Sequence, residues 1–116
     1  MEASPKTIIN YETQEGRQPF RDWISSLKDK PTVARIRARI NRIEQGNFGD
    51  SKTVGEGVLE LRLKFGSGYR VYFAQDGVQI VVLLIGGDKS TQDQDVLSAH
   101  KYWADYKRRT QHETSK

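Results

Sequence analysis

The 116-residue chain contains no cysteine, and this absence excludes several kinds of functional site at once. Disulfides, thiolate zinc sites, iron–sulfur clusters and a cysteine nucleophile all require a thiol. The only histidines are His100 and His112, so a histidine-rich metal cluster is excluded as well. We therefore expect a protein that uses neither a metal ion nor another cofactor.

Long hydrophobic runs are also missing. The longest apolar run, from Ile80 to Ile85, is far shorter than the roughly 20 residues that span a bilayer. The segment from Met1 to Pro5 lacks the basic-then-apolar pattern of a secretory signal. The length suits one ordinary domain. We therefore predict a single cytoplasmic domain over residues 1–116 without a membrane partner, in which residues 107–116 fray because they contain no apolar side chain.

Positive charge is concentrated in one part of the chain. Nineteen lysines and arginines against fifteen acidic residues give a net charge of +4. The segment 17–42 alone carries +6, from two aspartates and eight basic residues: Arg17, Arg21, Lys28, Lys30, Arg35, Arg37, Arg39 and Arg42. Such a cluster is typical of a surface that binds RNA, DNA or an acidic protein. A solvated arginine-rich helix face has the same pattern, so both interpretations stay open.

The first half of the chain predicts one strand and two helices. Residues 6–12 are short and β-rich, which is typical of a strand. Pro19 suits the first turn of a helix that ends near residues 28–30. Pro31 begins a second helix, which ends before Gly46 and carries a single apolar stripe: Val33, Ile36, Ile40 and Ile43. So short a connection predicts an antiparallel helical hairpin.

After a glycine-rich loop over residues 47–57, the apolar period changes to two. Three strands are predicted, joined by glycine-containing turns: 59–65, 69–74 and 78–85. The last of them is nearly all apolar, as expected of a strand covered on both faces. Thr91 is the expected cap of a final helix. The order β-α-α-β-β-β-α predicts an α+β fold, in which a sheet is backed by helices.

Strand alternation places basic side chains on one face of two neighbouring strands. Arg62 and Lys64 lie opposite the apolar face of their strand, and Arg70 shares one face of the next strand with Tyr72. The hairpin turn between the strands brings these four side chains together, and Lys89 follows the third strand at the sheet edge. Guanidinium and ammonium groups stabilise charge on phosphate oxygens, and a tyrosine stacks on bases. The pattern favours a phosphodiester site.

Other polar residues nearby have ordinary structural explanations. A basic outward face is commonly only solvated, and Glu60 on the same face would pair with Arg62. The pair Gly86–Gly87 is interpreted as a strand end rather than a phosphate loop, and His100 as a structural histidine. The acids near the start of the last helix are expected to interact favourably with its dipole: Asp88, Asp93 and Asp95.

Four stretches of sequence together point to a family. They are GNFGD, VGEGVLELRL, GSGYRVYF and LLIGGDKSTQDQD. Combined in this order, they resemble the RelE/ParE superfamily of bacterial toxins, and within it the HigB-like addiction-module killer proteins. The resemblance covers almost the whole chain. It implies a compact RelE/ParE-like toxin domain with a small antiparallel sheet packed against an N-terminal helical hairpin and a C-terminal helix.

The resemblance also implies an activity and partners. RelE-like and HigB-like toxins cut mRNA on the ribosome without a metal, and they are held by an antitoxin that is often a helix-turn-helix protein. By position, Arg62 or Lys64 matches the basic residues of the family's second strand, Arg70 matches the arginine of its GYR element, and Lys89 matches the basic residue after its last strand. RNA binding is assigned to Tyr72 and to three helix arginines: Arg35, Arg39 and Arg42.

At one position the chain departs from RelE, which carries a tyrosine where this chain has Asp95. Either Tyr72 or Asp93 takes that role, or another general base acts, or the chain does not cleave RNA. Two alternatives to the endonuclease therefore stay open. One is a toxin of the ParE kind, which poisons DNA gyrase. The other is a binding module that represses operator DNA together with its antitoxin, with residues 35–42 as the contact.

Overall fold

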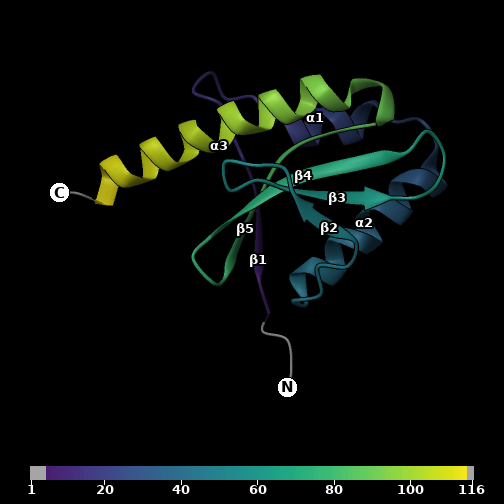
Figure 1. Cartoon of the computed structure of the whole chain (residues 1–116), viewed down its shortest axis with the longest axis horizontal. Coiled ribbons are helices and arrows are strands. Elements are labelled where there is room, and N and C mark those ends of the chain that lie inside the picture. The colour runs from purple at the N-terminus through teal and green to yellow at the C-terminus, as the bar shows by residue number, and fades with distance from the viewer. Residues whose placement is uncertain (1–4, 115–116) are drawn as a thin grey trace.

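A five-stranded sheet lies between two layers of helices in this chain (Figure 1). The computed structural model describes the backbone of residues 5–114 and the side chains of residues 5–110. The elements follow in the order β1 (Thr7–Asn10), α1 (Pro19–Ser26), α2 (Lys30–Glu44), β2 (Ser51–Thr53), β3 (Leu59–Leu63), β4 (Tyr69–Asp76), β5 (Ile80–Gly87), the short 3-10 turn η1 (Lys89–Thr91) and α3 (Gln92–Thr114). The predicted α+β fold is thus confirmed.

The sheet differs from the prediction in two details. Its strand order is β1-β5-β4-β3-β2, and β1 runs parallel to β5, so the sheet is mixed rather than purely antiparallel. The segment 51–53, predicted to be part of a loop, forms the edge strand β2 and pairs with β3. Three residues are too few to show a period of two, and a pairing between distant segments leaves no local pattern.

Both faces of the sheet are covered. One face packs against α1 and α2 around a core of large apolar side chains: Phe20, Ile24, Ile36, Ile40, Ile43, Leu61, Leu63, Val71, Phe73, Val81 and Leu83. The other face packs beneath α3 around a second core: Tyr11, Val58, Tyr72, Ala74, Val82, Leu84, Ala99 and Trp103. Figure 1 shows α1 and α2 behind the sheet and α3 across its near side. The basic face of β3 and β4 therefore lies on the α3 side.

A bulge interrupts the pairing of β4 with β5. Tyr72 is paired with Ile85, whereas the next residue, Phe73, is paired with Leu83, so Leu84 is an extra residue on β5. Leu84 and Ile85 both pack into the core beneath α3, although they are consecutive along the strand. A bulge of this kind bends a strand and increases its twist. After the bulge the side chains alternate between the two faces again: Gly86 faces α1 and Gly87 faces α3.

The two glycines that end β5 are packed on opposite sides. A Cβ atom added at Gly86 would lie 2.2 Å from the ring of Trp23 in α1, and one added at Gly87 would lie 1.8 Å from the Asp95 carboxylate in α3. Any side chain would therefore push a helix away from the sheet. The pair is a strand end, as predicted, and it also sets the closest approach of both helical layers.

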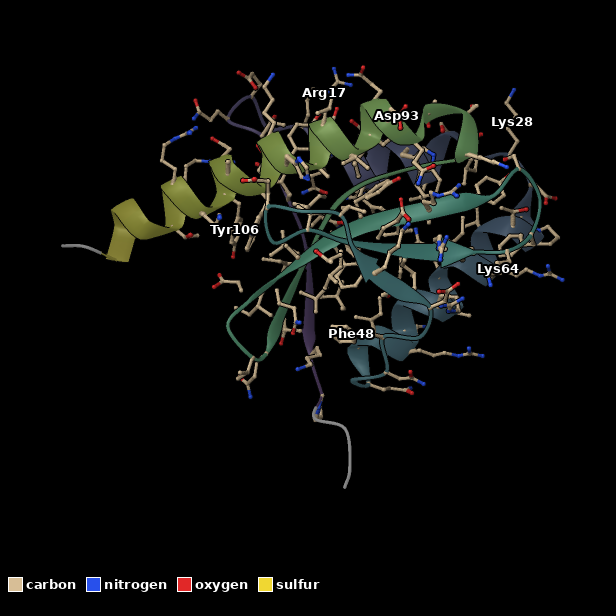
Figure 2. The ribbon with its side chains drawn as sticks, in the orientation of Figure 1. Arg17, Lys28, Phe48, Lys64, Asp93 and Tyr106 are labelled. Atoms are coloured by element: carbon tan, nitrogen blue, oxygen red, sulfur yellow. The ribbon has the colours of Figure 1, made fainter. Side chains whose placement is uncertain are left out.

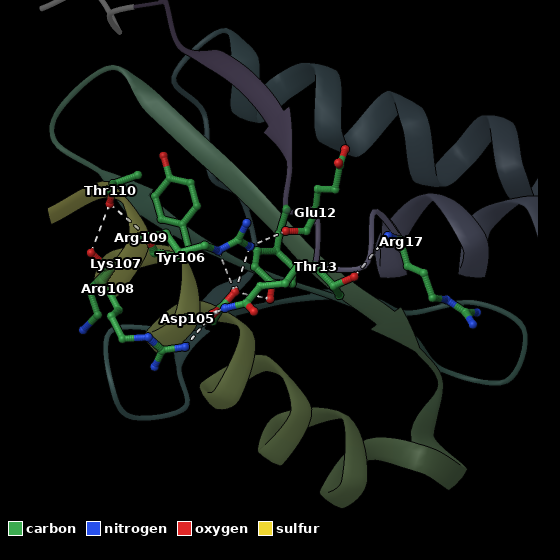
Figure 3. A network of polar contacts seen from close by, with 11 residues as sticks. Glu12, Thr13, Arg17, Asp105, Tyr106, Lys107, Arg108, Arg109 and Thr110 are labelled. Atoms are coloured by element: carbon green, nitrogen blue, oxygen red, sulfur yellow. Dashed lines mark hydrogen bonds and ion pairs between the residues drawn. The ribbon is translucent and has the colours of Figure 1, made fainter. Parts of the chain in front are cut away.

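The last helix is longer than the sequence indicated. Residues 107–114 continue α3, although fraying was expected from Lys107 onward; residues 115–116 lie outside the described part. Asp105 explains the difference, because it pairs with Arg108 at 2.6 Å and with Arg109 at 2.7 Å, one turn further along the helix. Arg109 also donates to the carbonyl of Glu12, so the helix is tied to the segment that follows β1 (Figure 3). No helix within residues 5–114 is long and apolar enough to cross a membrane.

Candidate functional site

Two arginines lie side by side where β3 and β4 pair. Arg62 is directly opposite Arg70 in the register of the two strands, on the face that α3 covers further along. The side chain of Arg62 is 38% exposed, and that of Arg70 is 12% exposed. The Nε atoms of both are buried and have no hydrogen-bond partner among the described residues. The exposed part of each side chain therefore excludes Nε, which leaves the terminal nitrogen atoms of each guanidinium to meet a ligand.

The hairpin turn fixes Arg70 and brings Lys89 next to it. Arg70 donates from Nη1 to the carbonyl of Gly68 at 2.7 Å. A Cβ atom at Gly68 would lie 3.4 Å from both that Nη1 atom and the Cβ atom of Lys89, so the two residues flank this glycine. The backbone N–H of Lys89 donates to the carbonyl of Ser67 at 3.3 Å. The turn and η1 are thus joined, and three of the four predicted catalytic residues lie together.

Lys64 lies further out, one residue beyond β3. Its side chain is 81% exposed, and its Nζ atom is 3.7 Å from Asp50. Asp50 also lies 4.0 Å from Arg62, so this one acid faces two of the cations. The expected pairing of Arg62 with Glu60 is wrong, because Glu60 pairs with Arg70 instead. In Figure 2, Lys64 and Lys28 mark the end of the molecule on which these cations gather.

Tyr72 is fully buried, so its ring is not accessible for stacking on a base. Its ring is covered by the core beneath α3, and its hydroxyl donates to the carboxylate of Glu60 at 3.0 Å. Burial raises the pKa of Tyr72 well above its usual range, and the charge of Glu60 raises it further. The hydroxyl therefore stays protonated at neutral pH. It acts as a hydrogen-bond donor and not as a base.

The acids of the predicted helix start have different surroundings. Asp88 accepts from the backbone N–H of Ser90 at 2.9 Å and caps η1, while Asp93 is exposed in the first turn of α3. Asp95 is buried against Gly87 and accepts from the Thr91 hydroxyl at 2.6 Å. Burial raises the pKa of Asp95, and the hydrogen bond from Thr91 partly offsets that effect. Asp95 is thus a buried carboxylate beside the sheet end and more than a favourable charge on a helix dipole.

The basic helix α2 reaches the same end of the sheet. The guanidinium of Arg35 lies over the ring of Phe65, 5.0 Å from its centroid, and Arg39 approaches the carbonyl of Arg62 at 3.5 Å. Arg42 is exposed in the last turn of the helix. Two of the three helix arginines assigned to RNA binding therefore border the hairpin that carries Arg62 and Arg70.

Half-buried aromatic side chains, which the sequence analysis did not single out, lie at the same hairpin end, on the opposite face of the sheet from Arg62 and Arg70. The ring of Tyr69 is 5.6 Å from that of Phe65 and 6.3 Å from that of Trp23. All three rings are partly exposed on the α1 side of the hairpin end. The signal was available in the sequence, since Phe65 and Tyr69 flank the glycine-rich turn. These rings, and not Tyr72, are the aromatic surface near the basic residues.

Two further side chains have structural roles. His100 places Nε2 2.9 Å from the carbonyl of Val54, and thereby joins α3 to the loop before β3, as expected of a structural histidine. Glu60 is fully buried and accepts from the side-chain amide of Gln92 at 2.9 Å. Among the side chains that the structure describes, no group of three or more His, Cys, Asp or Glu residues is placed to hold a metal ion.

Comparisons with known proteins place the chain in a family. Residues 22–103, well over half of the chain, match the phage-derived protein Gp49-like family (DUF891). An uncharacterized protein of Haemophilus influenzae is 51% identical over 80 residues, which are 69% of this chain and 81% of the relative. The matched region contains the basic hairpin end and the start of α3. The chain therefore belongs to the Gp49-like family of phage-derived proteins, which is a toxin-like family.

Proposed function

We propose that this chain is the toxin of a type II toxin–antitoxin system, of the HigB-like branch, and that it cleaves mRNA on the ribosome without a metal ion. The observation that carries the proposal is the pair of cross-strand arginines, Arg62 and Arg70, whose side chains are adjacent at the end of the sheet and 38% and 12% exposed. Adjacent guanidinium groups suit a phosphate, which accepts several charge-assisted hydrogen bonds.

The reaction has a simple balance. The ribose 2′-oxygen forms a bond to the adjacent phosphorus and loses its proton, while the bond from phosphorus to the 5′-oxygen breaks and the leaving oxygen gains a proton. The products are a 2′,3′-cyclic phosphate and a 5′-hydroxyl end. Negative charge grows on the phosphate oxygens in the transition state, and preorganised cations that face it lower the barrier.

The roles of the four cations follow from their exposure. Arg70 is the most buried and the most fixed, so it is assigned to the scissile phosphate. Arg62 lies across the strand pair and shares that phosphate, and Lys89 supplies a third charge beyond Gly68. Lys64, which is almost free in solvent, is assigned to a neighbouring phosphate of the chain. Tyr72 is not the proton acceptor, because its pKa is raised.

Base recognition is assigned to the aromatic rings at the hairpin end. Phe65 and Tyr69 flank the turn that joins the strands of Arg62 and Arg70, so a nucleic-acid strand that passes around this end of the sheet would meet both, and aromatic side chains stack on unpaired bases. Arg35 and Arg39 extend the positive surface along α2. Arg42 continues it at the end of the helix.

A toxin of this kind has an antitoxin as its partner. We expect a helix-turn-helix protein that covers the basic end with acidic or extended segments, and that carries the complex to operator DNA. The affinity of such a complex falls as salt is added, because both charge pairing and phosphate binding are screened. A complex whose affinity does not change with salt would count against this arrangement.

The test is primer extension on a reporter mRNA after brief induction of the protein. Arg70→Ala would leave the buried Glu60 without its cation, so Arg70→Lys is the better variant, since it keeps a charge and loses the planar donor fork. We expect new 5′ ends inside translated codons for the wild type, and a loss of about 100-fold in both Arg70→Lys and Arg62→Ala. Arg108→Ala, on the far part of α3, is the matched control with full activity.

Growth arrest with intact mRNA would overturn the proposal. The target would then be DNA gyrase, which a supercoiling assay with purified protein detects. Absence of growth arrest, combined with operator binding by the antitoxin complex, would assign the chain to repression instead.

A further inference from the structure

Glu60 is the most unusual charged residue in the described part of the chain. It is the second residue of β3, and its side chain is 0% exposed. A carboxylate taken out of water loses its hydration, and the loss is compensated only if both oxygens are well paired. A neutral side chain of the same shape would avoid that cost. The charge of Glu60 therefore needs a reason other than stability.

The contacts of Glu60 are one-sided. Its Oε2 atom accepts from the Tyr72 hydroxyl at 3.0 Å and from the Gln92 amide at 2.9 Å, while Oε1 is buried without a hydrogen-bond partner among the described residues. Within the part of the chain that the structure describes, its one cation is Arg70, whose Nε atom is 3.7 Å from Oε2. Two neutral donors thus fix the carboxylate in place, and its charge is directed at a single arginine.

Arg70 is in turn held at two points. Its Nε atom faces Glu60, and its Nη1 atom donates to the carbonyl of Gly68. Nη2 takes part in neither contact. A guanidinium held at Nε by a buried carboxylate and at Nη1 by a backbone carbonyl presents its remaining donors in a fixed direction, at little entropy cost when a phosphate arrives.

We propose that Glu60 is a positioning residue, whose buried charge holds the Arg70 guanidinium in the orientation that meets the scissile phosphate, with Tyr72 and Gln92 as its supports. This inference rests on the proposed ribonuclease function and adds to it the part of the site that lies beneath the surface. It predicts that the charge of Glu60 is needed for the chemical step and not for folding. It also predicts that Glu60 acts through Arg70 alone.

The experiment measures cleavage of a defined mRNA on purified ribosomes by the full-length wild type and by Glu60→Gln. Glutamine keeps the shape and one acceptor oxygen but has no charge. We expect the cleavage rate at saturating protein to fall about tenfold, the half-saturating concentration to stay within about twofold, and the melting temperature to stay equal or rise. Glu44→Gln, an exposed glutamate of α2, is the matched control and is expected to match the wild type in all three.

A double-mutant cycle tests the route through Arg70. Arg70→Lys is expected to cost less in the Glu60→Gln background than in the wild type, because the orientation that it disturbs is already lost. Additive losses would overturn the inference. An unchanged rate in Glu60→Gln would also overturn it while leaving the proposed function intact. A folded wild type that cleaves no mRNA would overturn the proposed function, and this inference with it.

If Glu60→Gln does not fold, a measurement on the wild type tests whether the Arg70 guanidinium is held in one orientation. The Nε–H group of Arg70 is expected to give a separate, slowly exchanging ¹⁵N–¹H resonance, which is assigned by its disappearance in Arg70→Lys. A resonance that overlaps those of the exposed arginines would show a mobile guanidinium and would overturn the inference.

Discussion

Two carboxylates in this chain accept a tyrosine hydroxyl and face an arginine, yet they are built differently. Asp105 in α3 is paired on both oxygens: Oδ1 with Arg108, and Oδ2 with Arg109 and the hydroxyl of Tyr11 (Figure 3). Its side chain is 13% exposed. Glu60 in β3 is completely buried, and one of its oxygens has no described hydrogen-bond partner.

The contacts of Asp105 stabilise the fold, whereas those of Glu60 are retained although burying its charge costs free energy. Burial alone would raise the pKa of Asp105, but the hydrogen bonds from Tyr11 and Arg109 outweigh it and hold the pKa below its usual range. Folding is therefore favoured by the ionised Asp105, which ties α3 to the segment after β1. At the basic hairpin end, by contrast, Oε1 of Glu60 and the Nε atoms of Arg62 and Arg70 are buried without a hydrogen-bond partner among the described residues.

The largest expected effect comes from removing the charge of Asp105. Asp105→Asn weakens its pairing with both arginines at once, and we expect the free energy of unfolding to fall by about 2 kcal/mol. Urea unfolding measures the loss. Cleavage by the folded variant is expected to be unchanged, which is the reverse of the pattern for Glu60→Gln. A loss of activity in Asp105→Asn at a temperature where it is fully folded would break the distinction between the two regions.

The difference in unfolding free energy between the wild type and Asp105→Asn is expected to depend on pH. Because the pKa of Asp105 is lower in the folded state than its unfolded value of about 3.9, its contribution is present above that value and is lost as pH falls through the folded pKa. The difference in unfolding free energy between the wild type and Asp105→Asn should be complete at neutral pH and shrink below about pH 4. A difference that is constant over this range would show that Asp105 acts through shape and not through charge.

The two tyrosines allow a smaller comparison. Tyr72→Phe removes a donor from a fully buried carboxylate and should destabilise the protein by about 1–2 kcal/mol, whereas Tyr11→Phe should cost about half as much. Alkaline titration followed at 295 nm gives a second measure. Burial and the neighbouring Asp105 raise the pKa of Tyr11 to about 12, and Tyr72 is expected to ionise only with unfolding. If Tyr72→Phe and Tyr11→Phe lower the free energy of unfolding by the same amount, the deeper burial of Glu60 has no effect on the strength of this contact.

The smallest effect is expected at the surface. Arg108 is 68% exposed, and its ion pair with Asp105 is open to solvent and salt. Arg108→Ala should therefore change the free energy of unfolding by less than about 0.5 kcal/mol. Arg109→Ala should cost more, since Arg109 also covers the ring of Tyr11. If both substitutions lower the free energy of unfolding by the same amount, the contact between α3 and the segment after β1 does not depend on Arg109.

Much of the fold could be predicted from local patterns. The alternation over residues 59–65 and the turn at 66–68 predicted the hairpin, and with it the adjacency of Arg62 and Arg70 that the register shows. The apolar run of β5 correctly predicted a strand covered on both faces. These features repeat along the chain or lie close together in it, so they leave a signal in the sequence.

The burial of the basic face could not be predicted in this way. Tyr72 and Glu60 occupy positions that alternation assigns to the outward face, and only the path of α3 decides that they are covered. The support for Glu60 comes from Tyr72, 12 residues away, and from Gln92, 32 residues away. A single carboxylate in a strand has no pattern that reveals such partners, which is why the sequence analysis explained Glu60 as a surface ion-pair partner.

The bulge at Leu84 gives β5 one residue more than its alternation needs. Without Leu84, Ile85 would follow Leu83 directly, and Ile85, Gly86 and Gly87 would keep the faces that they have now. Deleting that residue would therefore remove one buried side chain from the core beneath α3 and reduce the bend of the strand, but it would leave both glycines against their helices. A residue inserted between Ile80 and Gly87 would instead need a second bulge, since a shift of one residue turns a strand segment over. We therefore expect homologues to tolerate the loss of one residue from β5 and to accept insertions at the exposed Gly77 turn.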